Sequence, residues 1–196
     1  DKGTRGQGDK GTRGQGDNFP QSHLCYYLIQ NLKSNVELYL IRHGIAQERT
    51  NDLADELRSL TSVGQQKTYL VANRLQNLGL RFDAILTSPL VRSRQTAEIL
   101  QAAGLSSQVV EDNYLAPGGD IYAWLKSVVA KEQKFTTLAI VGHQPDLGEW
   151  AEILIWGKAQ HKLVLKKAGI IGLSLPDNSV VGHSQLFWLT PPKFLL

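Results

Sequence analysis

Two histidines in the chain stand just past the ends of short apolar runs, and each lies beside a glycine. His43 lies between Arg42 and Gly44, and His143 follows Gly142. A neutral imidazole can act as a nucleophile, and nearby positive charge disfavours its protonated form. Arg42 could therefore bind an anion and also keep His43 neutral. Taken alone, either histidine is equally consistent with an ordinary turn at the end of a strand.

A second arginine stands where it could join the first. The segment 88–92 reads SPLVR, and a serine followed by a proline is typical of a helix start, which places Arg92 one turn further on. Helical side chains lean toward the N-terminus, so Arg92 can reach back over the preceding strand end, beside free helix amides. Two arginines and helix amides suit the spread negative charge of a phosphoryl group. Together with the histidines, they predict phosphoryl transfer.

The elements that would position these residues alternate between strands and helices. Apolar runs predict strands at 36–41, 82–87, 108–111, 137–141, 162–165, 169–175 and 185–189. Periodicity and capping residues predict helices at 61–78, 88–103, 120–130 and 145–156. This order predicts an α/β three-layer sandwich with a mostly parallel central sheet and antiparallel strands at one edge. Functional residues of such sheets collect at the carboxyl ends of strands, where both histidines and both arginines fall.

The composition is typical of a globular protein, with 42% hydrophobic and 20% charged residues and a net charge of +3. Such a small net charge gives no case for nucleic acid or an anionic membrane as partner. No apolar run approaches the roughly 20 residues of a membrane-spanning helix. The single cysteine, Cys25, excludes a disulfide framework within the chain and fits a reducing compartment. We therefore expect a cytoplasmic protein.

The N-terminal segment differs from the rest of the chain. Residues 1–16 are two copies of DKGTRGQG, a repeat without any apolar side chain. It cannot bury enough surface to offset the entropy of ordering, so we expect residues 1–35 to be a disordered or weakly structured extension and 36–196 to be the functional domain. Because the chain contains no methionine, we expect 1–35 to be either a dispensable extension or translated upstream sequence. A docking tail for a partner is the alternative.

Three segments resemble the signature blocks of the histidine phosphatase superfamily, which has the phosphoglycerate-mutase-like fold. They are LIRHG at 40–44, TSPLVRSRQTA at 87–97 and VGH at 141–143. Their order and compactness are most similar to the SixA-type phosphohistidine phosphatases. The segments RSLTSVG at 58–64 and KKAG at 166–169 support that branch. The resemblance covers the chain from about residue 36 to its last residue.

The resemblance implies a role for each matching residue. His43 accepts the phosphoryl group as phosphohistidine, and Arg42 and Arg92 bind its oxygens. His143 donates to these oxygens and stabilises the charge of the loose transition state. Arg58 adds a further substrate contact. No metal or other cofactor is implied, because the histidines and carboxylates lack zinc-ligand spacing and the arginines supply the positive charge.

One stretch departs from relatives that cleave phosphate esters, many of which carry an acidic residue in the loop after the third short strand. That acid protonates the departing alkoxide. The comparable loop reads YLAPGG at 114–119, and the nearest acids, Glu111, Asp112 and Asp120, lie outside it. The missing acid indicates a leaving group that departs without such help.

The sequence thus favours a monomeric hydrolase that removes phosphate from phosphohistidine on a protein partner through a covalent intermediate on His43. A small-molecule phosphomonoesterase of the same superfamily, with Glu111, Asp112 or Asp120 as the acid, is the closest alternative. A non-catalytic phosphate-binding module is a third, which the intact set of two arginines and two histidines argues against. Mutase activity is least expected, because the chain lacks long insertions for a bisphosphorylated sugar acid.

Overall fold

The structure is a computed structural model that describes residues 36–130, 135–177 and 179–196. The prediction made above for residues 1–35 lies outside the described residues. The strands are β1 (Val36–Arg42), β2 (Ala84–Thr87), β3 (Val109–Glu111), β4 (Thr137–Gly142), β5 (Ile170–Leu175) and β6 (Gln185–Thr190). The helices are α2 (Ser62–Asn77), α3 (Val91–Ala102), α4 (Ile121–Ala130) and α5 (Asp146–Trp156), with short 3-10 turns η1 (Asp55–Leu57), η2 (Asn113–Leu115) and η3 (Pro192–Phe194).

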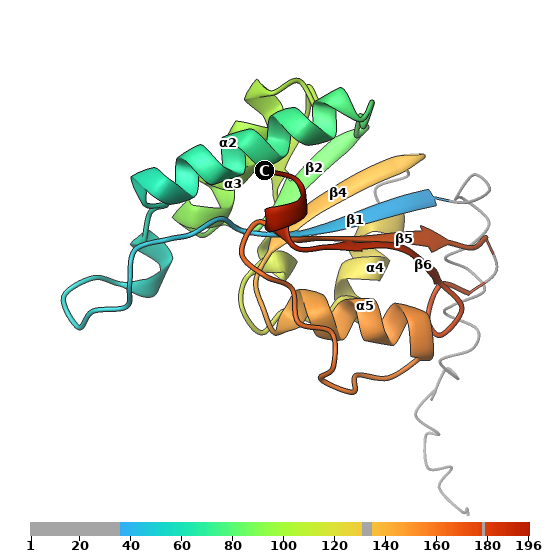
Figure 1. Cartoon of the computed structure of the whole chain (residues 1–196). Helices are drawn as coiled ribbons and strands as arrows, with labels where there is room; N and C mark the ends of the chain where they lie inside the picture. Colours follow the sequence, from blue (N-terminus) through green and yellow to red (C-terminus); the bar gives the residue numbers. More distant parts are fainter. Residues whose placement is uncertain (1–35, 131–134, 178) are drawn as a thin grey trace, which may run out of the picture.

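All six strands form one mixed sheet in the order β3-β2-β4-β1-β5-β6. The pairs β3–β2, β2–β4 and β4–β1 are parallel, whereas β1–β5 and β5–β6 are antiparallel. Helices α2 and α3 cover one face of the sheet, and α4 and α5 cover the other (Figure 1). This architecture confirms the expected three-layer sandwich with antiparallel strands on one side.

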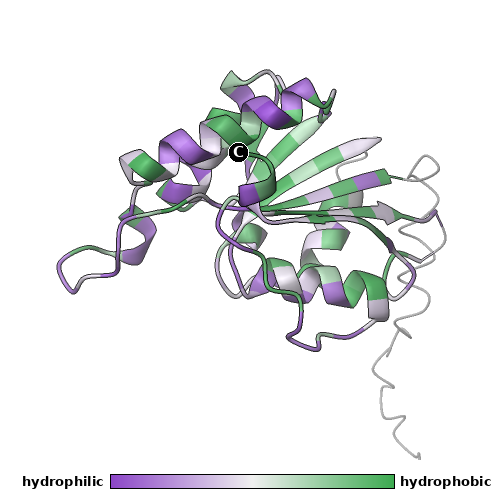
Figure 2. Cartoon of the chain, in the orientation of Figure 1, coloured by the Kyte–Doolittle hydropathy of each residue, from purple (hydrophilic) through white to green (hydrophobic). Residues whose placement is uncertain are grey.

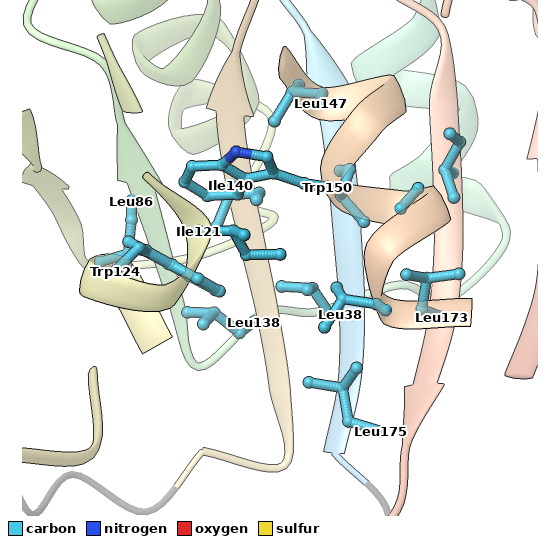
Figure 3. Packing of buried hydrophobic residues seen from close by; sticks show 14 of the residues in the cluster. Leu38, Leu86, Ile121, Trp124, Leu138, Ile140, Leu147, Trp150, Leu173 and Leu175 are labelled. Atoms are coloured by element: carbon cyan, nitrogen blue, oxygen red, sulfur yellow. The ribbon is translucent and has the colours of Figure 1, made fainter. Parts of the chain in front are cut away.

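Burial on both faces explains why the central strands are almost continuously apolar. In β1, Leu38 and Leu40 pack toward α4 and α5, and the alternate residues Tyr39 and Ile41 pack toward α2 and α3. Figure 2 shows this concentration of hydrophobic residues along the strands. Figure 3 shows the cluster on the α4 and α5 side, in which the rings of Trp124 and Trp150 lie 5.3 Å apart. Each fully buried leucine contributes about 1.5–3 kcal/mol to folding.

The register of the parallel strands brings the functional motifs to one edge of the sheet. Arg42, the last residue of β1, lies opposite Gly142 at the end of β4. Thr87, the last residue of β2, lies opposite Val141. The residues that follow these three strands therefore emerge side by side, as the rule for parallel sheets predicts.

Two sequence predictions need correction. Residues 162–165 are not a strand: the backbone amides of Gln160, His161, Lys162 and Leu163 instead donate to the buried carboxylate of Glu152. Side chains, those of Glu152 and Gln144, satisfy the amides of this segment in place of a neighbouring strand. The helix expected from Ser88 begins three residues later, at Val91, because the backbone of Leu90 is still extended, with φ −69° and ψ 137°. None of the helices in the described part of the chain combines the length and the apolarity needed to cross a membrane.

Candidate active site

The two strand-terminal histidines lie together, as predicted. The backbone amide of His43 donates to the carbonyl of Gly142 at 3.1 Å, which joins the ends of β1 and β4. The imidazole rings of His43 and His143 are 5.2 Å apart between centroids. Their side chains are buried among polar groups, with 6% and 4% of each residue exposed. A pair of largely desolvated imidazoles thus occupies the carboxyl edge of the sheet.

The hydrogen bonds of His43 fix the state of its ring. Its Nδ1 lies 2.7 Å from the carbonyl oxygen of Gly44. Because a carbonyl can only accept, Nδ1 carries the proton and Nε2 keeps its lone pair. Burial lowers the pKa of His43 to about 3, with the charges of His143, Arg92 and Arg42 acting in the same direction. At neutral pH His43 is therefore a neutral imidazole whose Nε2 carries the lone pair.

Gly44 allows the chain to pass closely between two helices at this point. A Cβ atom on Gly44 would lie 2.3 Å from Oγ1 of Thr68, a residue of α2. The amide of Gly44 donates to Oγ1 of Thr96 on α3 at 3.0 Å. A side chain on this residue would push the backbone away from both helices and would move the carbonyl that orients His43.

His143 is held by two serines and by Arg92. Its Nε2 lies 2.8 Å from Oγ of Ser88 and 3.4 Å from Oγ of Ser93, and its Nδ1 lies 3.4 Å from a terminal nitrogen of Arg92. Burial lowers the pKa of His143 to about 4, and the positive charge of Arg92 adds to this effect. The amide of Leu90 donates to Ser88 at 3.3 Å, so Ser88 both supports the turn before α3 and orients the second histidine.

Arg92 is almost completely buried, with 3% of its side chain exposed. Its Nε points at Nε2 of His43, at a distance of 3.3 Å. Its two terminal nitrogens donate to Asp55, one to the backbone carbonyl at 2.6 Å and one to the carboxylate at 2.9 Å. Burial lowers the pKa of Arg92. The guanidinium is thus clamped with one edge toward the histidines.

Asp55 is a site residue that sequence reasoning missed. Its carboxylate accepts from Arg49, Arg58 and Arg92. The hydrogen bond from Arg49, followed by those from Arg92 and Arg58, holds the pKa of Asp55 well below its usual range. Asp55 lies in a polar loop between β1 and α2, where no periodic pattern marks it. One carboxylate therefore gathers three arginines around the histidines.

Arg42 and Arg58 complete the set of predicted residues. Arg42 donates to the carbonyl of Leu165 at 2.7 Å, and burial lowers its pKa. Arg58 donates to the carbonyl of Gln47 at 2.6 Å as well as to Asp55. The structure thus brings the predicted Arg58 into the site, although it comes from the loop before α2 and not from a strand end.

All five predicted site residues line one pocket of about 440 Å³, referred to below as the pocket. Its wall also contains Arg49 and Lys167, so five cationic side chains face it. One carboxylate, that of Asp146, lies among the lining residues. Such an excess of positive charge around two neutral imidazoles suits an oxyanion such as a phosphoryl group. Among the described residues, no cluster of three or more His, Cys, Asp or Glu side chains is arranged to hold a metal ion.

The three acids considered in the sequence occupy other positions and do not line the pocket. Glu111 pairs with the exposed Arg94 at 3.4 Å. Asp112 accepts from the amide of Tyr114 at 3.0 Å, and Asp120 accepts from the amide of Tyr122 at 2.8 Å. The carboxylate of Asp112 therefore caps the turn η2, and that of Asp120 accepts from the first turn of α4.

A different acid, Asp146, reaches the pocket from the start of α5. Its Oδ2 accepts from the amide of Gly118 at 2.9 Å, in the loop that follows β3. Burial raises the pKa of Asp146. Pro117 and Gly118 of that loop also line the pocket, but they supply no acid. Sequence reasoning missed Asp146 because an acidic residue in the first turn of a helix is ordinary.

Comparison with known proteins places these features in a family. Residues 38–116 match the model of the histidine phosphatase superfamily, branch 1. An uncharacterized protein of Picosynechococcus sp. (strain PCC 7002) is 51% identical over 166 residues, covering 82% of this chain and 99% of the relative. Phosphohistidine phosphatase SixA of Escherichia coli K12 is 26% identical over 117 residues, covering 58% of this chain and 70% of SixA. A solved structure of the protein histidine phosphatase SixA in complex with tungstate superposes with a TM-score of 0.70 at 24% identity, covering 82% of this chain and 100% of that one.

Proposed function

Because the chain belongs to the histidine phosphatase superfamily, a family of phosphatases, we propose that it hydrolyses phosphohistidine on a partner protein. The observation that carries this proposal is the buried, neutral His43, whose Nε2 keeps its lone pair and accepts from Arg92 in a cationic pocket. The likeness to the SixA phosphatases supports the same substrate class. Tungstate, the ligand named for the SixA structure, is a tetrahedral oxyanion like phosphate.

In the first step, Nε2 of His43 attacks the phosphorus of the substrate and the substrate's P–N bond breaks. Substrate imidazole leaves as a neutral molecule, because its other ring nitrogen carries a proton taken from solvent. His43 becomes a phosphorylated imidazolium that still donates from Nδ1 to the carbonyl of Gly44. Arg42, Arg58 and Arg92 neutralise the charge on the three phosphoryl oxygens during the transfer.

In the second step, water attacks the phosphorus of phosphorylated His43. The P–N bond breaks, its electron pair returns to Nε2, and the two protons of water leave with the phosphate. His143 stabilises both transition states. In the structure, Nδ1 of His143 faces a terminal nitrogen of Arg92, which can only donate, so Nδ1 accepts there. When a phosphoryl oxygen takes the place of that contact, the hydroxyl of Ser88, which can donate as well as accept, can donate to Nε2 of His143 and leave a proton on Nδ1. That nitrogen lies on the Arg92 side of the ring, where it can donate to a phosphoryl oxygen.

A second candidate function, a small-molecule phosphomonoesterase, is favoured by Asp146. An alkoxide is a poor leaving group at neutral pH, so an esterase needs a positioned general acid. Asp146 lines the pocket, its carboxylate is anchored by Gly118, and its pKa is raised by burial. These properties suit proton donation to an alkoxide, whereas departing imidazole does not require it.

One experiment separates the two candidates. The parent protein and the Asp146→Asn variant are assayed on a phosphohistidine peptide, on p-nitrophenyl phosphate and on glycerol phosphate. Glu149→Gln is the matched control, because Glu149 lies on the same first turn of α5 and pairs with the exposed His161. We expect efficient phosphohistidine hydrolysis that changes only a few-fold in Asp146→Asn, and slow hydrolysis of glycerol phosphate.

Efficient hydrolysis of glycerol phosphate that falls by about 10²–10⁴ in Asp146→Asn, but not in the control, would identify a phosphomonoesterase with Asp146 as its acid. Failure of the parent protein on the phosphohistidine peptide would overturn the preferred function.

A further inference from the structure

A second hollow adjoins the pocket on the far side of Arg42. It has a volume of about 400 Å³, and Lys67, Lys166, Lys167 and Lys193 line it. Arg42 and Lys167 line both the hollow and the pocket, so the two adjoin at these residues. No acidic side chain is among the residues that line the hollow. We call this hollow, defined by its four lysines and Arg42, the basic groove.

The basic groove combines an apolar floor with a charged rim. Ile45, Ala168, Pro192 and Leu196 contribute apolar surface. All four lysines are exposed to solvent, which lets their charged ends stand at the rim while their aliphatic stems extend the apolar surface. A ligand that fits such a groove carries negative charge outside and apolar groups toward the floor.

Backbone hydrogen bonds fix the groove beside the reacting residue. The amide of Ala168 donates to the carbonyls of Arg42 and His43, at 3.0 and 3.1 Å. The amide of Gly169 donates to the carbonyl of Lys166 at 2.7 Å, and Ala168 has a positive φ of 59°. Lys166 and Lys167 therefore project from a tight turn held against the end of β1. The turn η3, which carries Lys193, lies near α2, which carries Lys67 (Figure 1).

Three of these lysines lie outside the pocket. The pocket is not lined by Lys67, Lys166 or Lys193. The five cationic side chains that line the pocket already supply enough positive charge to bind one phosphoryl group. The additional positive charge faces the space next to the phosphoryl group, where the rest of a large substrate would lie.

From this placement we propose that the basic groove docks an acidic, partly apolar segment of the phosphohistidine-bearing protein. The inference rests on the proposed function and names the kind of partner. Single ion pairs between exposed groups contribute little, so the lysines act mainly by steering an acidic partner and raising its rate of association. Rigid placement of the groove beside His43 would then present the phosphohistidine to the pocket.

The test uses three phosphohistidine peptides that differ in their flanking residues. In the acidic peptide the flanks are Asp and Glu interleaved with Leu, and in the basic peptide they are Lys and Arg interleaved with Leu. In the neutral peptide the flanks contain only Ser and Gly. We expect the parent protein to hydrolyse the acidic peptide with a kcat/KM at least about tenfold above that of the neutral peptide, and the basic peptide most slowly. Added salt should reduce this preference.

The double variant Lys67→Glu/Lys193→Glu should lose the preference for the acidic peptide and retain activity on p-nitrophenyl phosphate within about twofold, because neither residue lines the pocket. The control Lys126→Glu/Lys158→Glu makes the same charge change at exposed lysines in α4 and just after α5. It should behave as the parent does. Thermal unfolding of each variant verifies that it folds.

Equal hydrolysis of the acidic and neutral peptides by the parent would overturn the proposal. So would an equal loss on the acidic peptide and on p-nitrophenyl phosphate in Lys67→Glu/Lys193→Glu, since the lysines would then serve the pocket. A parent that hydrolyses no phosphohistidine peptide would refute the proposed function instead. In that case, fluorescence anisotropy of the labelled, unphosphorylated peptides tests whether the groove docks an acidic segment. Weaker binding of the acidic peptide by the variant than by the parent supports docking, and no binding of that peptide by the parent refutes it.

Discussion

The pocket and the basic groove share Arg42 and Lys167, but they present positive charge in different ways. In the pocket, Arg92 is buried and its guanidinium is held by the backbone and carboxylate of Asp55. Around the groove, Lys67 and Lys193 stand in solvent. Burying a cation is costly unless it is paired and hydrogen-bonded, whereas an exposed ammonium remains hydrated. The arginine site is therefore built for fixed geometry, and the lysine rim for adaptable, long-range attraction.

This comparison also explains why the pocket needs an acidic residue. Without Asp55, Arg49, Arg58 and Arg92 would repel one another beside two imidazoles. The carboxylate holds them in place before an anion arrives, so little reorganisation is needed when a phosphoryl group binds. The groove has no such residue among its lining side chains, which leaves its charge available to a partner.

The largest expected effect comes from removing the nucleophile of the pocket. His43→Ala removes the nucleophile and should reduce turnover by about 10⁴-fold or more, and it should abolish acid-labile phosphate trapped on the protein by rapid quench. The control His183→Ala removes an exposed histidine and should leave both signals intact. Substantial turnover by His43→Ala would contradict the covalent mechanism.

A smaller loss tests whether the pocket needs the shape of arginine as well as its charge. Arg92→Lys keeps the charge but loses the fork that reaches Asp55 and His43, so we expect kcat to fall by about 10²–10³. Arg94→Lys, in the same helix, should have little effect because Arg94 is exposed. Lys67→Arg in the groove should likewise leave peptide hydrolysis within about twofold. Comparable activity of Arg92→Lys and Arg94→Lys would remove the distinction between the two regions.

The acid sensitivity of folding tests the desolvation of the histidines. Both rings bind a proton less readily in the folded protein than in the unfolded chain. Their pKa values are about 3 for His43 and about 4 for His143 in the folded protein, against about 6.5 in the unfolded chain. The free energy of unfolding should therefore decrease as pH falls below about 6.5, by up to about 1.4 kcal/mol per pH unit for each histidine. Urea unfolding between pH 4 and 8 measures this slope.

His143→Gln should make that slope shallower, and His183→Gln should not. The difference in slope between the parent and His143→Gln should be largest between about pH 4 and 6. In that range the ring of His143 gains a proton only when the parent protein unfolds. A slope unchanged by His143→Gln would mean that the folded protein already binds the proton, contrary to a dry, cationic site.

The smallest expected effect concerns the segment that links the two regions. Gln144 donates to the carbonyl of Leu163 and accepts from the amide of Leu165, both at 3.1 Å, and Leu165 in turn accepts from Arg42. Gln144→Ala leaves these backbone groups without their partner, which should lower stability by about 1–3 kcal/mol. It should reduce activity on acidic peptides a few-fold more than activity on p-nitrophenyl phosphate. A selective loss on the small substrate would show that the segment serves the pocket alone.

Most of the fold could be predicted from local patterns. The apolar runs and the capping residues are local signals, and Thr61 does cap α2 by accepting from the amide of Gly64 at 3.0 Å. The strand predicted at 162–165 was wrong because the amides of Lys162 and Leu163 donate to the side chain of Glu152 on α5, a contact that no local pattern encodes. A short apolar segment looks the same in sequence whether a strand or a carboxylate satisfies its amides.

The sequence by itself determined which side chains stand at the strand ends. Residue type and position relative to a strand were enough to select His43, His143, Arg42 and Arg92, because parallel strands deliver their carboxyl ends to one edge. Tertiary structure alone decided how those side chains are held and what surrounds them. Asp55 reaches Arg92 from a loop that no periodicity encodes, Asp146 lines the pocket from the first turn of α5, and the basic groove is assembled from segments more than a hundred residues apart. Loop conformation depends on long-range contacts, so neither the clamp on Arg92 nor the groove beside it could be inferred before the chain was folded.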